Sequence, residues 1–425
     1  MRDAAHNLKW YASYQAASNA LAWLPIFFLY FNQYVTLEEV ISLSAFYYLA
    51  VVISEVPSGY FSDRYGRRIT LICSSLLMIA AYLVFIIADG FSMLLVGEVL
   101  LAFGIAFQSG SDSALLYDSL VEHRTTHPEL ATSHNDEYAT LESKARQAAL
   151  LAMSLACFVG GILGTINLVL PYVLALIGAL IALGISVSFV EPSNEQRFGK
   201  HVLSPTPGII KQLRICFSLL HDRLLAWLFL VSVVAYSLQH IPYEFYQPYI
   251  RLLSDNNQLH GVFSGEAPLV AGVITGLSMF GGVLGARSAM VLLTKLGLKK
   301  LMISGALAQI VIIAGLALFL HPAMLLLVLF RNFPMAMTHG PLMGAIAPRV
   351  ASAQRATFLS LQSLAGRFAF SLTLFALARF VGRGQDVSWP ALSSLLQASV
   401  IGGVICVALI FIVAPRRFSQ SEDAR

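Results

Sequence analysis

Polar and aromatic side chains recur at helical spacing along one long apolar stretch near residue 240. They stand at positions i, i+3, i+4, i+7, i+8 and i+11, as Tyr236, Gln239, His240, Tyr243, Glu244 and Gln247. That spacing places all six on one face of a helix. Aromatic rings beside hydrogen-bonding groups suit the binding of an organic solute. The alternative is a polar seam between packed helices that touches no ligand.

Smaller groups of polar side chains lie in three other apolar stretches. Arg331 stands deep in its stretch, and we expect it to hold an anionic group of a ligand, or a carboxylate such as Glu244. The candidate ligand-binding residues share a polar or aromatic side chain inside an apolar run. They are Gln15, Asn19, Gln108, Tyr236, Gln239, His240, Tyr243, Glu244, Arg331 and Asn332.

Ionisable side chains inside apolar stretches are candidates for carrying protons. In a membrane a charged side chain costs about 2.5–3.5 kcal/mol on insertion scales, so it faces a cavity or a partner. The candidates are Glu55, Glu98, Asp112, Glu244 and His339. These carboxylates favour protons over sodium as the coupling ion. The alternative for His339 is a plain hydrogen-bonding role, although histidine does titrate near neutral pH.

The elements that carry these side chains are apolar runs long enough to cross a bilayer. The chain is 57% hydrophobic and 12% charged, against roughly a quarter charged in an average soluble domain. A helix of about 20 residues spans the ~30 Å hydrocarbon layer and leaves no backbone group unpaired there. The sequence therefore predicts an all-α, polytopic membrane protein with twelve spans, at Trp10–Tyr34, Val40–Ser62, Ile69–Ala88, Ser92–Leu116, Arg146–Asn167, Leu170–Val190, Leu224–Ile250, Leu269–Leu293, Leu301–Leu320, Ala323–Pro348, Thr357–Val381 and Trp389–Ala414.

The basic residues are distributed unevenly between the loops of this topology. With twelve spans, the side that holds both termini carries most lysines and arginines, while the other side receives only Arg251, Arg379 and Arg383. Basic loops mark the cytoplasm. We therefore expect a multi-pass plasma membrane protein, of a bacterial inner membrane, with both termini cytoplasmic. The net charge of +4 follows from this topology, and no nucleic-acid partner is expected.

A long polar interruption divides the chain near its midpoint. We predict an N-terminal six-helix half at 1–190, a central cytoplasmic loop at 191–222 and a C-terminal six-helix half at 223–425. A weak repeat supports the two halves, because Asp63–Arg68 has an echo at Thr294–Lys299. The four cysteines lie far apart and without metal-ligand spacing. Neither a metal site, a cofactor nor a disulfide framework is expected.

The turn between the second and third predicted spans reads Gly59-Tyr-Phe-Ser-Asp-Arg-Tyr-Gly-Arg-Arg68. It resembles the signature loop of the major facilitator superfamily (MFS) of transporters. The resemblance implies two six-helix halves that rock about a central site, with this loop in the cytoplasmic gate. It also implies that Asp63 caps the start of span 11 and that Arg67 pairs with Asp118. The gate candidates are Gly59, Asp63, Arg64, Gly66, Arg67, Asp118 and Arg367, the glycines allowing a close approach and a tight turn.

Other family patterns are matched less well. Spans 2 and 11 adjoin in the family fold, so we expect Glu55 and Arg367 to form a buried ion pair. Glu98 stands where the family's span 4 commonly has arginine. The span 5 pattern of antiporters, Gly-Pro-x-x-Gly-Gly, reads Ala156-Cys-Phe-Val-Gly-Gly161 and lacks the proline. This departure leaves the direction of transport open.

The leading hypothesis is a secondary active transporter for a small organic solute, working by alternating access in the lipid bilayer. No nucleotide-binding Gly-x-x-x-x-Gly-Lys-Ser/Thr motif and no nucleophile–base cluster occurs, so an enzyme is not expected. Proton-coupled efflux of a drug-like molecule or metabolite is favoured over proton-coupled uptake of a metabolite or siderophore-like molecule. A transport-dead receptor or assembly factor and an integral-membrane enzyme are remote alternatives. The resemblance implies a monomer.

Overall fold

The computed structural model describes residues 4–126, 134–192, 218–259, 266–346, 349–350, 352–381 and 387–415, and every element in these ranges is helical. The chain divides into two compact units. Unit 1 comprises Met1–Val35, Glu39–Ser204 and Glu266–Gly276, and unit 2 comprises Thr36–Glu38, Pro205–Gly265 and Leu277–Arg425. Most of the predicted central loop lies outside the described residues, and the division at 190 and 223 stays a prediction.

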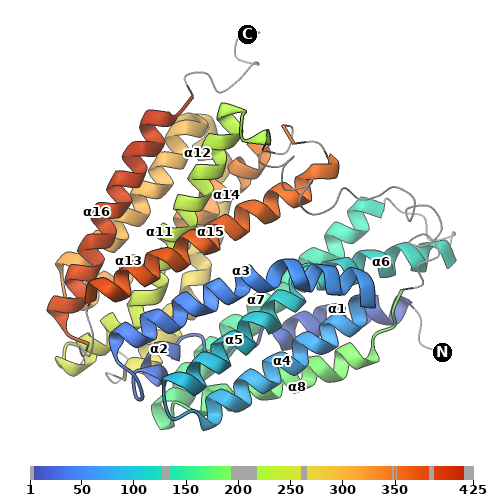
Figure 1. The fold of residues 1–425 in the computed structure, drawn as a ribbon, viewed down its shortest axis with the longest axis horizontal. Helices are drawn as coiled ribbons and strands as arrows, with labels where there is room; N and C mark the ends of the chain where they lie inside the picture. The colour runs from blue at the N-terminus through green and yellow to red at the C-terminus, as the bar shows by residue number, and fades with distance from the viewer. Residues whose placement is uncertain are drawn as a thin grey trace. The chain divides into compact units, whose positions relative to one another are not determined.

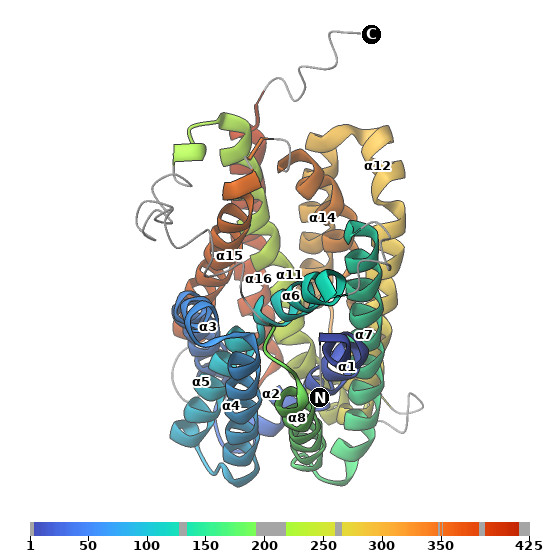
Figure 2. The same cartoon turned by 90° about the vertical axis from the view of Figure 1, so that its right-hand side faces the viewer.

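Unit 1 is built around three closely packed helices. Its elements are α1 (Ala4–Ser18), α2 (Phe27–Phe31), α3 (Leu37–Tyr65), α4 (Arg67–Ile87), α5 (Phe91–Gln108), α6 (Ser111–Thr126), α7 (His134–Ile166) and α8 (Leu170–Ser188). Helix α4 packs against α5 and α8, and these three lie side by side in Figures 1 and 2. Helix α1 packs against α6, α7 and α8. The buried rings of Tyr30 and Phe85 lie against Tyr172, with centroids 4.8 and 5.2 Å away.

Unit 2 is organised around the long helix α11 (Arg223–Asp255), which packs against α14, α15 and α16. The remaining elements are α12 (Ala267–Leu318), η3 (Pro322–Met324), α13 (Leu325–Leu329), α14 (Phe333–Ile346), α15 (Ser352–Val381) and α16 (Trp389–Val413). The first turns of α12 belong to unit 1. Trp227 is buried in the core, where its indole N–H donates to the carbonyl of Ile410 over 2.9 Å.

Three predicted spans are not single helices. In span 1, helix α1 ends at Ser18 and α2 begins at Phe27; Pro25 has no amide hydrogen for a helix, and Asn19 donates its side chain to the Gln15 carbonyl at 2.9 Å. Span 4 breaks between α5 and α6 at Gly110, whose φ is +77°. Span 10 breaks between α13 and α14. The hydrophobic pattern of the sequence indicates how long an apolar run is, and it does not indicate where the helix breaks within that run.

The signature turn and its echo share an unusual backbone conformation. Gly66 has φ +100° and ends α3 before α4 begins, while Gly297 has φ +73° inside α12. Only glycine adopts this region at low cost. Helix α12 therefore contains both predicted spans 8 and 9, which meet at Gly297. The two copies of the weak repeat thus turn the chain by the same means.

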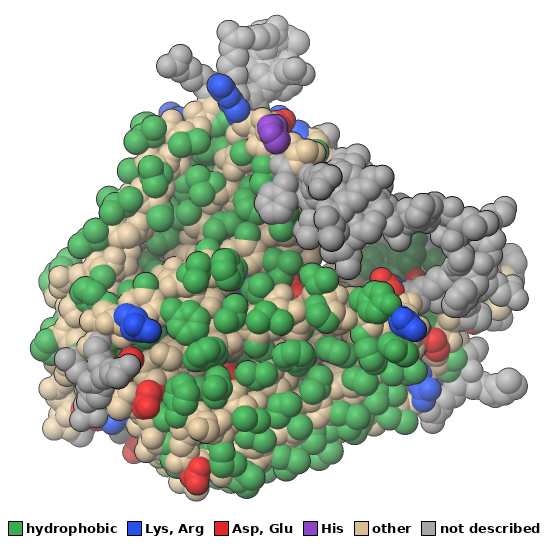
Figure 3. All heavy atoms as spheres, in the orientation of Figure 1, with side chains coloured by type: hydrophobic (Ala, Val, Ile, Leu, Met, Phe, Trp, Pro, Cys, Tyr) green, Lys and Arg blue, Asp and Glu red, His purple; other side chains and the backbone are tan. Residues whose placement is uncertain are grey.

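The helices suit a membrane environment. Nine of the described helices are long and apolar enough to cross a bilayer. Counting α12 as two spans, and adding the broken spans 1 and 10, gives the predicted twelve. Figure 3 shows one face on which apolar side chains predominate and charged ones are sparse. The predicted all-α membrane fold is confirmed.

Candidate solute-binding site

Arg331 lies at the break in the tenth span, between α13 and α14. Two features of the sequence stop the helix here: Pro334 cannot donate a backbone hydrogen bond, and the polar pair Arg331–Asn332 interrupts an apolar run. The carbonyl of Arg331 accepts a hydrogen bond from Gln309 Nε2 of α12 at 2.8 Å. Such non-helical backbone is tolerated inside a membrane protein where side chains satisfy it.

Two tyrosine rings of α11 hold the Arg331 guanidinium. Its central carbon lies 4.6 Å from the ring centroid of Tyr246 and 5.3 Å from that of Tyr243. Arg331 is only 2% exposed, and its Nε and Nη1 atoms have no hydrogen-bond partner among the described residues. Within the same ranges no carboxylate pairs with it, so the predicted alternative of a Glu244 partner is not found. A buried guanidinium without an anion is costly, and it is ready to bind one.

Asn332 forms the second polar part of this site. Its Nδ2 donates to the carbonyl and the hydroxyl oxygens of Ser278, at 3.2 and 3.3 Å. Its Oδ1 accepts from Gln239 Nε2 at 3.5 Å. The amide of Asn332 is thereby held between α11 and α12. The structure brings Gln239, Tyr243, Arg331 and Asn332 together within unit 2. We call these four residues and Tyr246 the arginine cage.

The other members of the predicted α11 stripe have different surroundings. His240 stacks on Tyr236, with ring centroids 3.9 Å apart, and its Nδ1 lies 2.7 Å from the carbonyl oxygen of Tyr236. Its ring also packs against Tyr243 at 6.2 Å. Glu244 is buried, and Gln247 is fully buried and donates to the Tyr246 hydroxyl at 3.1 Å. Part of the stripe is therefore a packing seam.

Unit 1 has its own polar network, centred on Asp112 at the start of α6. Gln15 Nε2 donates to Asp112 Oδ2 at 2.6 Å, and the backbone N–H of Ser113 donates to Oδ1 at 2.7 Å. Gln15 also donates to the Tyr11 hydroxyl at 3.0 Å, which donates in turn to Glu142 of α7 at 3.3 Å. We call Tyr11, Gln15, Asp112, Ser113 and Glu142 the acid network.

The remaining predicted binding and proton residues of unit 1 lie around or apart from this network. Asn19 donates to Gln15 Oε1 at 3.2 Å, and Gln108 Nε2 donates to the Ser18 hydroxyl at 2.9 Å. Glu98 is buried in α5. The predicted pair of Glu55 with Arg367 joins residues of different units and stays a prediction.

The signature turn is fixed by contacts inside unit 1. Arg67 pairs with Asp63 at 2.8 Å and approaches Asp118 Oδ2 with its Nε at 3.8 Å. The carboxylate of Glu191 accepts the backbone N–H groups of Arg67 and Arg68, both at 2.7 Å. These are the first amides of α4, which a carboxylate stabilises as a cap.

The two glycines of the turn differ. A Cβ built on Gly66 would lie 2.6 Å from the Glu191 carboxyl carbon, whereas at Gly59 it would meet no atom within 4 Å among the described residues. A close contact is therefore seen at Gly66 within unit 1, and the part of Gly59 in the gate stays a prediction. Arg64 is exposed and donates to Tyr60 at 2.9 Å, apart from the Arg67 cluster. The expected cap of span 11 by Asp63 concerns the other unit and stays a prediction.

Four residues of these clusters were not predicted, namely Ser113, Glu142, Glu191 and Tyr246. Tyr246 follows Tyr243 by three positions, so its place beside the stripe was visible in the sequence. Glu142 lies before the apolar run of α7, and Glu191 directly follows α8. Glu142 and Glu191 each form a hydrogen bond with a residue more than 100 positions away in the sequence. No local pattern indicates such a pairing.

Comparison with known proteins gives a consistent result. The Major Facilitator Superfamily model matches residues 12–374. The fold is similar to that of the nucleoside transporter NupG, with a TM-score of 0.76, 12% identity, and coverage of 97% of this chain and 100% of that one. It is also similar to that of a peptide transporter POT in complex with sulfate, with a TM-score of 0.69, 16% identity, and coverage of 97% of this chain and 94% of that one. A D-xylose-proton symporter has a TM-score of 0.63 and 15% identity, with coverage of 97% of this chain and 98% of that one. No curated protein matches.

Proposed function

Because the chain belongs to the major facilitator superfamily, we propose that it is a proton-coupled secondary transporter whose solute carries an anionic group. One observation supports the anion most directly: the Arg331 guanidinium is buried against two tyrosine rings and leaves Nε and Nη1 without partners among the described residues. An anion bound there would accept from an unpartnered N–H group in a low-dielectric site, where charge-assisted hydrogen bonds are strong. Gln239 and Asn332 would orient the solute.

We assign the proton to the acid network of unit 1. Asp112 and Glu142 are linked through Gln15 and Tyr11, and no described lysine or arginine pairs with either of them. Two linked carboxylates without a cation hold one proton more readily than two negative charges. In this family fold two halves alternate in access to each side, so protonation in one half can change the state in which the solute site of the other half opens.

Efflux of a drug-like molecule or metabolite is our first assignment of direction, since rings dominate the arginine cage. Uptake is the second candidate, supported by the missing proline in the antiporter pattern at Ala156–Gly161. One fold neighbour is by name a D-xylose-proton symporter, and for this second candidate we propose that solute and proton move in the same direction. We further propose a monomer in a bacterial inner membrane with cytoplasmic termini.

The test is transport by the purified protein in liposomes. A pH gradient is imposed, internal pH is followed with a trapped dye, and pools of organic anions and matched neutral solutes are added. We expect an anion to move together with protons, and the movement to be lost in Arg331→Gln and kept in Arg349→Gln. Arg349 is exposed and donates to the carbonyl of Ala345 at the end of α14. Equal transport by the Arg331→Gln variant would contradict the anion assignment. Opposite gradient requirements for accumulation would distinguish efflux from uptake.

A further inference from the structure

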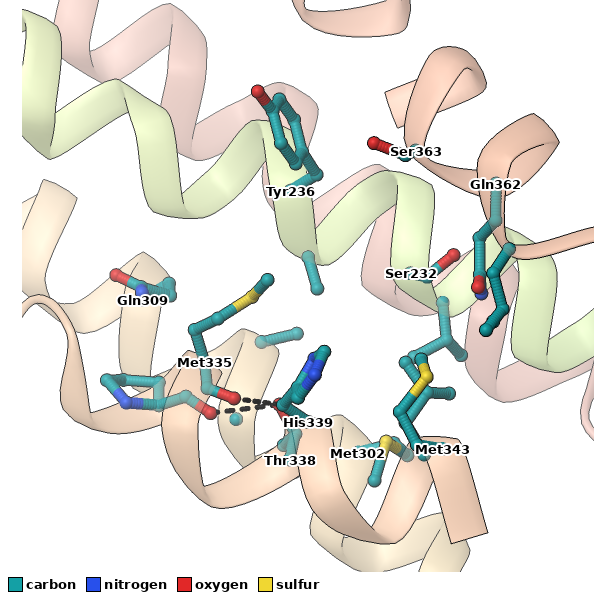
Figure 4. A pocket seen from close by; sticks show the side chains of 17 residues that line it. Ser232, Tyr236, Met302, Gln309, Met335, Thr338, His339, Met343, Gln362 and Ser363 are labelled. Carbon is teal, nitrogen blue, oxygen red and sulfur yellow. Dashed lines mark hydrogen bonds between the residues drawn. The ribbon is translucent and has the colours of Figure 1, made fainter. Parts of the chain in front are cut away.

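Unit 2 contains a cavity that the proposed function does not yet use. Its volume is about 430 Å³, within the ordinary size range of small-molecule sites. Helices α11, α12, α14 and α15 form its walls, and all its lining residues belong to unit 2. Figure 4 shows it from close by. We call it the methionine cavity.

The lining is apolar and free of permanent charge. Met302, Met335 and Met343 contribute thioether side chains, and none of the described residues that line it is Asp, Glu, Lys or Arg. Methionine adapts its shape to irregular ligands. The cavity therefore suits an uncharged, largely apolar group of variable shape.

Two buried amides provide polar contacts at opposite sides of the cavity. Gln309 of α12 is 3% exposed and its Oε1 has no partner, while Gln362 of α15 is 6% exposed and its Nε2 has none, among the described residues. In Figure 4 the Gln362 side chain runs from α15 toward the cavity, where the His339 ring also points. Buried polar atoms are nearly always hydrogen-bonded in folded proteins. One vacant acceptor and one vacant donor match a ligand with an N–H or O–H and a carbonyl or ether oxygen.

The methionine cavity and the arginine cage share a wall. Gln309, which lines the cavity, donates its Nε2 to the carbonyl of Arg331 at 2.8 Å. Tyr236 also lines the cavity and stacks on His240, whose ring packs against Tyr243 of the cage. The two sites are therefore adjacent within one unit.

We propose that the methionine cavity binds the uncharged body of the solute whose anionic group Arg331 holds. This rests on the proposed function and names the solute class as amphipathic organic anions, with an apolar body that carries at least one hydrogen-bonding group. The charge is recognised in the cage, and the size and polarity of the body are selected in the cavity.

The test is methionine-methyl NMR on the full chain in lipid nanodiscs. The protein is labelled with [methyl-¹³C]methionine and titrated with 4-phenylbutyrate, with its neutral amide 4-phenylbutanamide, and with acetate. We expect both phenyl probes to shift the methyl signals of Met302, Met335 and Met343 saturably. The carboxylate should bind about tenfold more tightly than the amide, and acetate should leave these signals unshifted. Met78 and Met153, in unit 1 helices α4 and α7, serve as internal controls.

Three variants separate the two sites. Ala306→Phe fills the cavity from α12 and should weaken the binding of both phenyl probes at least tenfold. Leu307→Phe, at the neighbouring exposed position, should leave their binding unchanged. Ser363→Leu narrows the cavity from α15 and replaces Ala306→Phe if that variant does not fold. Arg331→Gln should weaken binding of the carboxylate at least about 30-fold and leave the affinity for the amide within threefold.

The outcomes distinguish this inference from the function on which it rests. Loss of carboxylate binding in Arg331→Gln without any shift of the cavity methionines overturns the inference and leaves the proposed anion site standing. Cavity shifts with unchanged carboxylate affinity in Arg331→Gln overturn both. Equal shifts at Met78 and Met153 show partitioning into lipid and overturn the cavity assignment, as does the absence of saturable shifts with either phenyl probe.

Discussion

The two units place their functional charges in opposite ways. In unit 1 the acid network surrounds two carboxylates with hydrogen-bond donors, from Gln15, Tyr11 and Ser113. In unit 2 the arginine cage surrounds a cation with aromatic rings and leaves two of its nitrogens unpartnered among the described residues. The first arrangement can gain or lose a proton without an outside ligand. The second is complete only when an anion binds.

This difference indicates a division of labour within the chain. A carboxylate can take up or release a proton whether or not a solute is bound, so the network can respond to pH by itself. A buried guanidinium keeps its charge at every relevant pH, so only a solute can compensate it. The predictions below test whether the two tasks separate along the two units.

The largest expected effect is on proton movement in Asp112→Asn. The variant keeps an oxygen that accepts from Gln15 and loses the titrating group. Solute-driven internal pH change should fall to background, while solute exchange without a pH gradient stays within about threefold of wild type. Both are measured in liposomes, with Glu137→Gln as the control, an acid that pairs with Arg124 outside the network. Persisting proton movement would remove Asp112 from the coupling role.

The next effect is on solute affinity in Arg331→Gln. Losing one partner of a buried, hydrogen-bonded charge pair costs about 2–5 kcal/mol, which corresponds to at least about 30-fold in affinity. Binding of an anionic substrate is measured by calorimetry in nanodiscs. Arg331→Lys should recover only part of the loss, since an ammonium lacks the planar contact with two rings. If Lys restores full affinity, the cage geometry is not needed.

A smaller effect concerns stability at the signature turn. Gly66→Ala places a Cβ 2.6 Å from the Glu191 carboxyl carbon. The backbone conformation of Gly66 (φ +100°, ψ 158°) is adopted almost only by glycine and costs other residues about 1–3 kcal/mol. Thermal unfolding should therefore occur at a lower temperature. Gly59→Ala is the matched control, because Gly59 lies inside helix α3, where a Cβ would meet no described atom within 4 Å, and alanine is favoured there by roughly 0.5–1 kcal/mol. We expect the unfolding temperature to fall in Gly66→Ala and to rise in Gly59→Ala. A change in the same direction in both variants would contradict the strain assigned to Gly66.

The smallest effect is expected for Tyr246→Phe. The hydroxyl accepts from Gln247, while the ring face holds Arg331. Removing only the hydroxyl should change anion affinity less than about threefold, whereas Tyr246→Leu removes a cation–π contact of about 2 kcal/mol in a desolvated site. The two Kd values, measured side by side, show whether the ring face or the hydroxyl holds the cation. A larger loss of anion affinity in Tyr246→Phe than in Tyr246→Leu would assign the cation to the hydroxyl instead of the ring face.

Much of the fold followed from the sequence. The apolar runs predicted the helices within a few residues, as for α4 and α16, because burial in lipid depends on local composition and length. The α11 stripe placed Gln239 and Tyr243 on one helix face, and in the structure they lie beside Asn332 and Arg331. It also included Gln247, which is buried against Tyr246, because helical periodicity gives the face of a side chain and does not give its partner.

The sequence by itself determined the number of spans, the turn glycines and the polar candidates, since all three depend on residues close together along the chain. Only the tertiary structure decided that Glu191 caps α4, that Glu142 bonds to Tyr11 and Ser113, and that Arg331 packs against Tyr243 and Tyr246. Each of these contacts joins residues that are distant in sequence. Their geometry depends on how whole helices pack, and helix packing is a property of many side chains together.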